Sequence, residues 1–243
     1  MSDDAMAARA AGEGSLVRRA MEAVTGHIRE QNLRVGDTLP GEAHFAERLG
    51  VSRAVMREAF GALAALRLID VANGRRPRVG AMDGSVMAAS LDHAVSTAQI
   101  TVPEIWDVRR TIELRTAALA AERRTDAEAA EIGALVEAMA ADANDLVART
   151  RHDIAFHEAI ARASHNALFV QIVTSFVPLM SVAVPAAWQT RTAIRQREVM
   201  IERHRAVAAA IARRDPAGAT MAMSAHFDES IRDLLEAEDA IAG

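Results

Sequence analysis

Apolar residues recur at helical spacing along most of the chain, and turn residues divide the pattern into separate elements. One face of the first predicted helix, which begins near Ser15, carries Leu16, Ala20, Val24 and Ile28. Two short helices follow at about 41–49 and 52–66, because Gly50 can end the first and Ser52 can cap the second. Two helices joined by a Gly-Val-Ser turn predict a helix-turn-helix.

A strand pattern follows these helices. Residues 68–71 and an arginine-rich segment ending at Val79 predict two short strands, and Asn73-Gly74 between them favours a tight hairpin turn. This hairpin is the expected wing of a winged helix-turn-helix domain over residues 15–81. A disordered tail is expected over residues 1–14, which are small, polar and rich in alanine and glycine.

Beyond residue 100 the pattern is helical, and several helix starts are visible. Thr101 and Thr125 each stand three residues before a glutamate, which is the spacing of a capping box. Pro103 lies in the first turn of the helix that Thr101 would cap, and Asp215-Pro216 is a typical helix start. Thr150 can cap a further helix, and Pro178 should kink the helix that contains it. The predicted helices span residues 102–123, 126–147, 151–163, 166–184, 191–213 and 216–239.

The expected fold class is therefore mainly α. An N-terminal winged helix-turn-helix is followed by a C-terminal all-helical antiparallel bundle of six to seven helices. Residues 82–100, with a short helix at about 83–95, form the expected linker. Residues 101–243 form the expected effector-binding and dimerisation domain.

Composition narrows the class of protein. The chain has 243 residues, of which 51% are apolar, so it can form globular cores. No apolar run approaches the roughly 18 residues that span a bilayer, and the first residues lack the features of a secretory signal. We therefore expect a cytoplasmic protein with no membrane partner. Cysteine is absent and eight histidines are present, so any transition metal would be held by histidine and carboxylate.

The net charge of −5 is unevenly distributed along the chain. Residues 1–80 carry 12 Arg against 10 acidic residues, whereas the remainder carries 16 Arg against 23 acidic residues. The acidic balance therefore belongs to the second part. Affinity for nucleic acid depends on where cations cluster more than on their sum, so the arginine positions matter more than the net charge.

The arginines of the N-terminal part form a candidate DNA-binding set. In the second helix of the predicted helix-turn-helix, Val55, Ala59, Ala62 or Leu63, and Leu66 are expected to face the core. Arg53 and Arg57 project together near the helix start, where arginine can contact guanine in the major groove, while Ser52 and the helix start can meet phosphate. Arg75, Arg76 and Arg78 of the wing can contact the backbone or the minor groove. The alternative is a solvated face with ion pairs, such as one between Arg57 and a neighbouring glutamate.

These motifs resemble the GntR family of winged-helix regulators. The resemblance covers nearly all of residues 16–80 through Gly36-Asp37-x-Leu39-Pro40-x-Glu42 and Leu49-Gly50-Val51-Ser52-Arg53-x-Val55-x-Arg57-Glu58-Ala59. It implies that Arg53 and Arg57 read bases. Gly41, Ala43 and the wing tip depart from the usual pattern of the family, which leaves the operator sequence open.

Histidines and one aspartate form a candidate sensing site in the C-terminal part. Asp153 and His157 are four residues apart on one predicted helix, so both can bind one ion from successive turns. His204 and His226 lie on two later helices, 22 residues apart, a spacing that can bring them to a similar height in an antiparallel pair. Three imidazoles and a carboxylate suit Zn, Mn, Fe or Ni. Taken singly, each histidine can equally be a hydrogen-bonded interior or surface residue.

Residues 104–240 resemble the FCD ligand-binding domain of the FadR-type branch of the GntR family. The resemblance is carried by Trp106-Asp107-Val108-Arg109-x-x-x-Glu113, Asp153-x-x-Phe156-His157, Asn166, Glu202, His204 and His226. It implies that Asp153, His157, His204 and His226 hold a divalent metal, most simply Zn, with Mn, Ni or Fe as alternatives. It also implies that Arg109 anchors the carboxylate of an effector, with Asn166 in the same site. The alternative for Arg109 is an ion pair with Glu113 on the helix surface.

Together these features predict a transcription regulator, a repressor whose operator affinity responds to a small organic acid. A homodimer would place two recognition helices on a pseudo-palindromic operator in double-stranded DNA. One alternative is a metalloenzyme with an accessory DNA-binding module, although no general base stands beside the expected ligands. Another is a purely structural metal without an effector.

Overall fold

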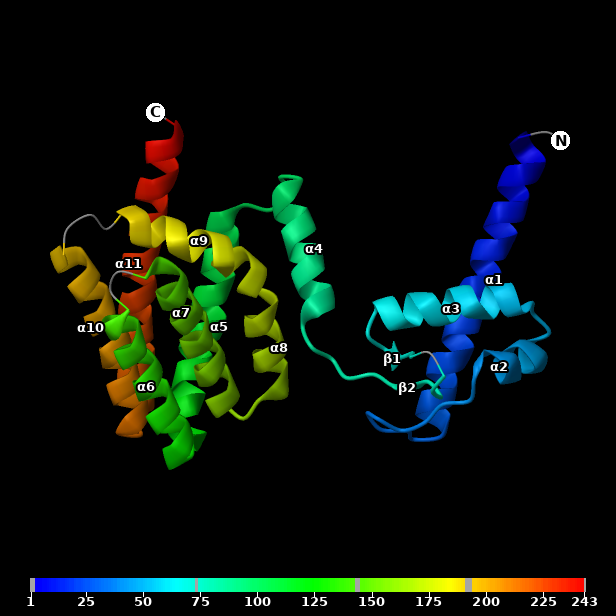
Figure 1. Ribbon diagram of the computed structural model, residues 1–243, viewed down its shortest axis with the longest axis horizontal. Helices are drawn as coiled ribbons and strands as arrows, with labels where there is room; N and C mark the ends of the chain where they lie inside the picture. The colour runs from blue at the N-terminus through cyan, green and yellow to red at the C-terminus, as the bar shows by residue number, and fades with distance from the viewer. Residues whose placement is uncertain (1–2, 73, 143–144, 191–193, 243) are drawn as a thin grey trace. The chain divides into compact units, whose positions relative to one another are not determined.

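The computed structural model describes residues 3–72, 74–142, 145–190 and 194–242. Contacts divide the chain into two compact units, Met1–Val86 and Met87–Gly243 (Figure 1). Each unit has its own apolar core. Both are mainly helical, and the described strands belong to one two-stranded sheet in the first unit.

The first unit is a winged helix-turn-helix. Its elements are α1 (Asp3–Glu30), α2 (Glu42–Leu49), α3 (Arg53–Ala65), β1 (Ile69–Asp70) and β2 (Arg78–Val79). The strands pair antiparallel, with Ile69 opposite Val79, as the hairpin pattern predicts. Asn73 of the expected turn lies outside the described residues.

Local sequence signals set the turn between α2 and α3. Gly50 ends α2 with a φ of 63°, a left-handed conformation that favours glycine. The Ser52 hydroxyl caps α3 by accepting from the Val55 amide at 3.2 Å. Both caps confirm the sequence-based expectation.

The buried face of α3 differs from the predicted one. Met56, Ala59, Phe60 and Leu63 are buried against α1 and α2, whereas Leu66 is 46% exposed. Ala59 and Leu63 were predicted correctly and Val55 is half-buried against the same core, whereas Met56 and Phe60 were missed and Leu66 was wrong. Apolar residues lie nearly all round this helix, so periodicity alone does not fix the face.

The N-terminal end also differs from the sequence-based expectation. Helix α1 begins at Asp3 rather than near Ser15, so residues 3–14 are helical and not a disordered tail. Alanine is the best helix former, and acidic residues are favourable in a first turn; this segment contains both.

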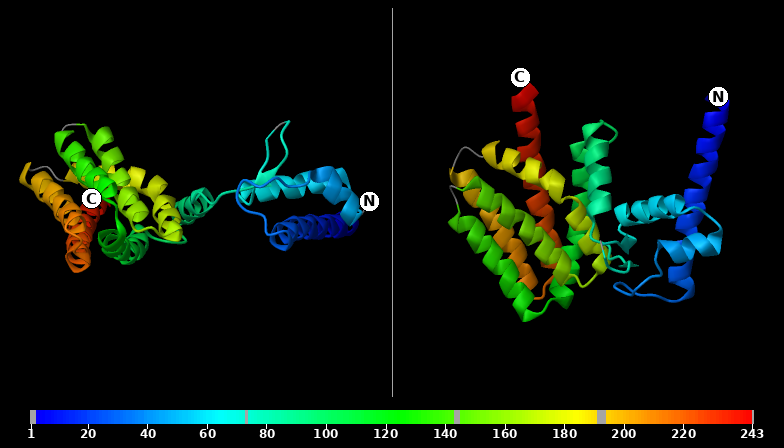
Figure 2. Two further views of the ribbon diagram at one scale, coloured as in Figure 1. Left: turned by 90° about the horizontal axis from the view of Figure 1, so that it is seen from below. Right: turned by 45° about the vertical axis from the view of Figure 1, so that its right-hand side comes forward.

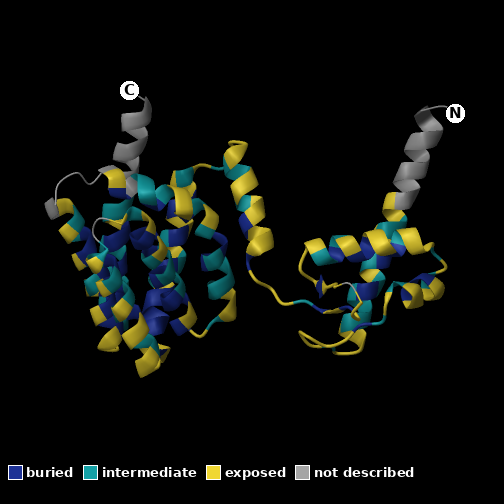
Figure 3. Ribbon diagram, viewed as in Figure 1, coloured by how far each residue is buried: buried dark blue, intermediate teal, exposed yellow. Residues whose placement is uncertain are grey.

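The second unit is an antiparallel helical bundle preceded by one shorter helix. Its elements are α4 (Ser85–Ser96), α5 (Val102–Arg123), α6 (Asp126–Ala141), α7 (Leu146–Ala163), α8 (Ala167–Ser175), α9 (Val177–Thr190), α10 (Ile194–Ala212) and α11 (Pro216–Ala242). Helix α5 packs against α7 and α11, α6 against α7, and α10 against α11, as the views in Figure 2 also indicate. Helix α4 adds Leu91 and Val95 to the edge of this core. Figure 3 shows the buried residues on the inward faces of the bundle helices.

Most helix starts of the bundle agree with the caps read from the sequence. Both capping boxes form, at Thr101 with Glu104 and at Thr125 with Glu128. Asp215 accepts from the Gly218 amide at 2.8 Å. The cap predicted at Thr150 is wrong: α7 begins at Leu146, and Asp145 caps it by accepting from the Ala148 amide at 2.9 Å.

The predicted helix over residues 166–184 is two helices. Helices α8 and α9 meet at Phe176, two residues before Pro178, with a bend of 52°. Proline lacks a backbone donor, and its ring clashes with the carbonyl four residues earlier, here that of Thr174 on α8, which accounts for the break. Among the described residues no single helix is long and apolar enough to cross a bilayer. Helices α8 and α9 reach that length and apolar character only when they are taken together across their bend.

Buried arginine fixes one end of the bundle. Arg124, between α5 and α6, donates to the carbonyls of Ile211 and Ala212 at the end of α10. The Ile211 carbonyl also accepts from the Arg214 amide at 3.1 Å, and the guanidinium gives both carbonyls at this helix end a side-chain donor. The contact holds α5 and α10 in register, and both helices carry residues of the candidate site.

Candidate metal centre and nucleic-acid interface

Three helices of the bundle bring the predicted metal ligands together in its interior. Asp153 and His157 lie one turn apart on α7, His204 lies on α10 and His226 on α11. All four side chains are buried, and His204 is fully so. Charged or polar groups buried in a core need partners, so their convergence calls for a chemical explanation.

The three histidines converge on one point. One ring nitrogen from each of His157, His204 and His226 lies within 4.8 Å of the others. The rings of His204 and His226 are closest, with centroids 4.4 Å apart. Three imidazole nitrogens this close together could share one metal ion.

The hydrogen bonds of His204 leave a nitrogen lone pair facing a carboxylate. Its Nδ1 lies 2.8 Å from the Met200 carbonyl, which can only accept, so Nδ1 carries a hydrogen. Its Nε2 then faces Asp153 Oδ1 at 3.0 Å. Two acceptors at this distance require either a second proton on the ring or a cation between them. This contact fits a metal ion, since the same two groups are ordinary ligands of Zn.

His157 is held on its opposite side by a buried glutamate. The Nδ1 of His157 is hydrogen-bonded to Glu113 Oε2, and its Nε2 faces Asp153 Oδ2 at 4.0 Å. The other oxygen of Glu113 accepts from Arg109 Nε at 2.9 Å and from Arg109 Nη2 at 2.8 Å. Arg109 thus forms the ion pair that was the alternative to its effector role, but inside the bundle and not on its surface.

The two buried carboxylates are held in their charged form. Burial raises the pKa of Asp153, but the hydrogen bond and charge that His204 supplies when its ring is protonated, the charge of a protonated His157 and the charge of Arg109 outweigh it, so the pKa is lowered. Burial likewise raises the pKa of Glu113, but the charge of Arg109, the charge of a protonated His157 and the hydrogen bonds from both outweigh it, so this pKa is lowered as well. The site therefore offers negative charge to a cation.

A small cavity adjoins the cluster. It measures about 30 Å³ and is lined by Trp106, Arg109, Asp153, His157, Met180, Val184, Trp188, Met200, His226, Phe227 and Ser230. Arg109 Nη1 donates to the Met180 sulfur at 2.6 Å, a weak acceptor that a carboxylate could replace. The indole N–H of Trp106 is buried and has no acceptor among the described residues. Two residues of the cavity lining thus carry donors that are weakly used or unused.

Not every predicted residue reaches this cavity. Asn166, expected near the effector, caps α8 by accepting from the Leu168 amide at 3.0 Å and is absent from the cavity lining. His152 and His165 pair with Asp142 and Glu128 outside the cluster. Sequence reasoning missed the contact between Glu113 and His157, the Met180 sulfur and the unused donor of Trp106. The spacing of Arg109 and Glu113 was the one available signal, and it suggested only a surface ion pair as the alternative to an effector role for Arg109.

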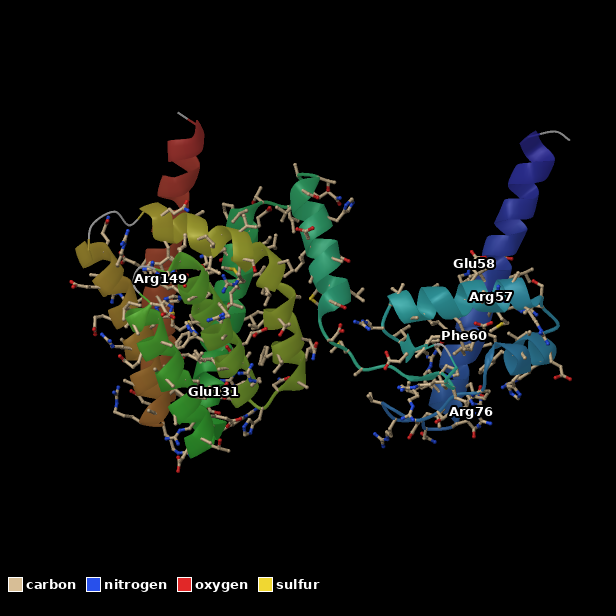
Figure 4. The ribbon with its side chains drawn as sticks, viewed as in Figure 1. Arg57, Glu58, Phe60, Arg76, Glu131 and Arg149 are labelled. Atoms are coloured by element: carbon tan, nitrogen blue, oxygen red, sulfur yellow. The ribbon has the colours of Figure 1, made fainter. Side chains whose placement is uncertain are left out.

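The first unit presents its predicted DNA-binding residues to solvent. Arg53, Arg57 and Ser52 are exposed at the start of α3, and the side chain of Arg57 is 77% exposed. Figure 4 labels Arg57 on this helix. Arg57 Nε lies 4.0 Å from a carboxylate oxygen of Glu42, a loose ion pair with a different glutamate from the adjacent Glu58 that was the expected alternative partner. The guanidinium keeps most of its donors available for a base edge.

The wing presents a second basic surface. Arg75, Arg76 and Arg78 are exposed and, with Thr38, border one hollow on the surface of this unit. Arg78 Nη1 donates to the Gly36 carbonyl at 3.2 Å, which orients this side chain along the loop. Such a cluster of guanidinium groups suits phosphate oxygens.

The chain is similar to known proteins over both units. Residues 16–79 match the family described as bacterial regulatory proteins, gntR family, and residues 104–229 match the FCD domain. The chain is 33% identical to the Glc operon transcriptional activator of Escherichia coli (strain K12), over 85% of this chain and 84% of that protein. It is 28% identical to the galactonate operon transcriptional repressor of the same strain, over 83% of this chain and 89% of that protein. A solved Streptococcus agalactiae GntR protein, 24% identical, covers 89% of this chain and 99% of its own with a TM-score of 0.67, which shows a shared fold.

Proposed function

We propose, because the chain belongs to the gntR family of bacterial regulatory proteins and carries an FCD domain, that a small carboxylate bound beside a metal controls its affinity for operator DNA. Family membership makes the chain a DNA-binding transcription regulator, and its relatives are regulators and not enzymes. The single observation that carries the finer proposal is the contact of His204 Nε2 with Asp153 Oδ1 at 3.0 Å, inside a cluster of three buried histidines.

The residues that would hold the metal are Asp153, His157, His204 and His226. Their nitrogen and oxygen donors suit Zn, with Mn, Ni or Fe as alternatives, and the absence of cysteine leaves no thiolate to compete. A divalent ion bound there supplies positive charge and open positions for an oxygen ligand.

Charge balance favours an anionic effector only when the metal is present. With neutral imidazoles, the charges of Asp153, Glu113 and Arg109 leave the buried site with one net negative charge. An acid anion would add a second negative charge to a buried region, which is costly. With a divalent ion in place, the same anion brings the site to neutrality. The proposal therefore makes acid binding dependent on metal.

Two donors are positioned to hold the acid. Arg109 Nη1 would exchange the Met180 sulfur for a carboxylate oxygen, a stronger charge-assisted bond. Trp106 lies under the same guanidinium, 4.8 Å from ring centroid to Cζ, and its unused N–H can donate to a hydroxyl or a second oxygen. A carboxylate with a neighbouring hydroxyl satisfies both donors, so hydroxy acids and sugar acids come first among the candidates.

The DNA-binding half of the proposal uses the exposed arginines. Arg53 and Arg57 of α3 would read bases in the major groove, and Arg75, Arg76 and Arg78 would contact phosphates or the minor groove. A homodimer would present two such units to a pseudo-palindromic operator. We further propose that the protein represses and that the acid relieves repression; one of the relatives above is an activator and the other a repressor, so a reporter assay with and without the acid decides the direction.

The test is a thermal-shift screen of the zinc-loaded protein against sugar acids, hydroxy acids, dicarboxylates and fatty acids, repeated after chelation. The expected result is a rise in Tm with one acid class that disappears without metal. The same acid should change operator affinity in a binding assay. A Tm that depends on metal while operator affinity ignores every acid would favour a structural metal. Turnover of an acid by the purified protein would favour the metalloenzyme.

A further inference from the structure

Glu113 makes hydrogen bonds to both halves of the candidate site. It is 1% exposed, and its two oxygens serve different partners: Oε1 accepts from Arg109, and Oε2 contacts His157 Nδ1. Arg109 faces the cavity, and His157 belongs to the histidine cluster. A carboxylate on α5 is thus placed between the acid anchor and a metal ligand that lies 44 residues away on α7.

An ionised carboxylate can only accept, and this fixes the hydrogen on His157. A neutral imidazole carries one N–H, and Glu113 requires it at Nδ1. The lone pair is then left on Nε2, the nitrogen that faces Asp153 at 4.0 Å. Without Glu113 the hydrogen could sit on Nε2, where it would block a metal bond.

We propose that Glu113 is the positioning residue that holds His157 in its metal-binding tautomer. Arg109 makes the carboxylate necessary for this role, because it would draw the single accepting oxygen of a Gln side chain at position 113 away from His157. This inference rests on the proposed metal site. Groups that orient a ligating histidine in this way commonly contribute about 10–100-fold to metal affinity. The assignment gives Glu113 a role that does not require contact with metal or acid.

Glutamine is the informative substitution because it has one accepting and one donating end. A guanidinium only donates, so the amide oxygen of Gln would turn toward Arg109, where the hydrogen bond is charge-assisted. The amide NH₂ would then face His157 Nδ1 and require it to accept. The hydrogen of the ring would then sit on Nε2, and His157 could bind a metal through Nε2 only after this nitrogen gave up its hydrogen.

The double variant Arg109→Met with Glu113→Gln separates this mechanism from simple damage. With Arg109 removed, the amide of Gln is free to turn its oxygen toward His157 and restore the hydrogen at Nδ1. The double variant should therefore bind metal more tightly than Glu113→Gln alone. If Glu113 served only to support the core, a second buried substitution would weaken binding further.

The experiment titrates Zn²⁺ into the chelator-treated full chain by calorimetry, with competition where binding is tight. Glu113→Gln should bind Zn²⁺ about 10–100-fold more weakly than the unmodified protein. Glu113→Asp, which keeps two acceptors, should lie between them. The matched control is Glu131→Gln, which removes an exposed carboxylate paired with Arg162 at 2.7 Å on the same unit and should leave Zn²⁺ affinity unchanged.

Nitrogen NMR of the metal-free protein above pH 7.5 reads the tautomer directly. His157 should carry its hydrogen on Nδ1 in the unmodified protein and on Nε2 in Glu113→Gln. An Nε2–H signal in the unmodified protein overturns the inference even if a variant fails to fold. So does equal Zn²⁺ affinity in Glu113→Gln, or a double variant weaker than the single one. Absence of Zn²⁺ binding to the unmodified protein would instead remove the proposed metal site itself.

Discussion

Asp153→Asn should reduce the metal response to a small remainder without weakening the metal-free protein. The residue was chosen because its Oδ1 faces the lone pair of His204 Nε2 at 3.0 Å. In the metal-free protein this places two acceptors together, which is unfavourable. The amide of the Asp153→Asn variant offers an N–H to the same nitrogen and turns the contact into a hydrogen bond. The free energy of unfolding of the metal-free variant should therefore equal or exceed that of the unmodified protein.

The metal-bound proteins should differ in the opposite direction. Zinc at 100 times its Kd stabilises the unmodified protein by about 2.7 kcal/mol. For a domain of this size each kcal/mol corresponds to about 2–4 °C, so Tm should rise by about 5–11 °C. If the substitution weakens binding about 100-fold, the same zinc concentration equals Kd and contributes only about 0.4 kcal/mol. The Tm of Asp153→Asn should then move by about 1–2 °C.

Differential scanning calorimetry with and without chelator measures both effects, following the transition of the helical unit. Asp107→Asn, an exposed change on α5, is the matched control and should behave like the unmodified protein. The reasoning fails if Asp153→Asn keeps the full metal shift. It also fails if the metal-free variant melts several degrees lower, since that would mean that His204 and Asp153 form an ion pair with a protonated ring.

Three further predictions concern the rest of the molecule. Arg57→Ala should weaken operator binding by about 1–3 kcal/mol, or about 5–150-fold in an electrophoretic shift assay, and unchanged affinity would remove the base-reading role. Arg75→Ala should weaken binding to all DNA sequences alike and reduce the slope of log K against log salt by about one; a sequence-dependent loss would argue for base contact instead. Thr125→Ala removes the hydroxyl of a capping box and should lower the unfolding free energy by about 1 kcal/mol in denaturant titration, whereas Thr125→Ser should retain most of it.

The fold was largely predictable because most helix ends are set by capping residues that can be recognised in the sequence. Ser52, Gly50, Thr101 and Thr125 cap helices through side chains or backbone conformations that the sequence displays directly. Thr150 failed as a cap because Asp145 competes for the same role a few residues earlier. The choice between them depends on burial of the first turns of α7, where Ala148 and Thr150 lie in the interior. Such burial is a tertiary effect that local signals do not contain.

The candidate site was predictable only in part, for the same physical reason. The spacing of Asp153 and His157 put them on one face of a helix, the spacing of His204 and His226 put them at a similar height, and the FCD resemblance joined the four as one ligand set. The hydrogen bond from His157 to Glu113 depends on how α5 packs against α7, over a sequence separation of 44 residues. No pattern within a helix encodes such a contact. Asn166 shows the converse case, since its visible local use is a cap on α8.

The small size of the cavity bears on how an effector could act. About 30 Å³ accommodates about two water molecules, which is less than any carboxylic acid needs together with a metal. The acid must therefore displace something, and the Met180 sulfur on α9 is the weakest partner in contact with Arg109. Packed interiors do not deform continuously, so displacement of the Met180 side chain would favour a second arrangement, either by a change of its rotamer or by movement of α9 relative to α5. Helix α9 is joined to α8 at a proline-associated bend, which gives it a point about which to move. An acid that binds only the displaced arrangement would shift the population of that arrangement, which is the condition for an effector to change DNA affinity at all.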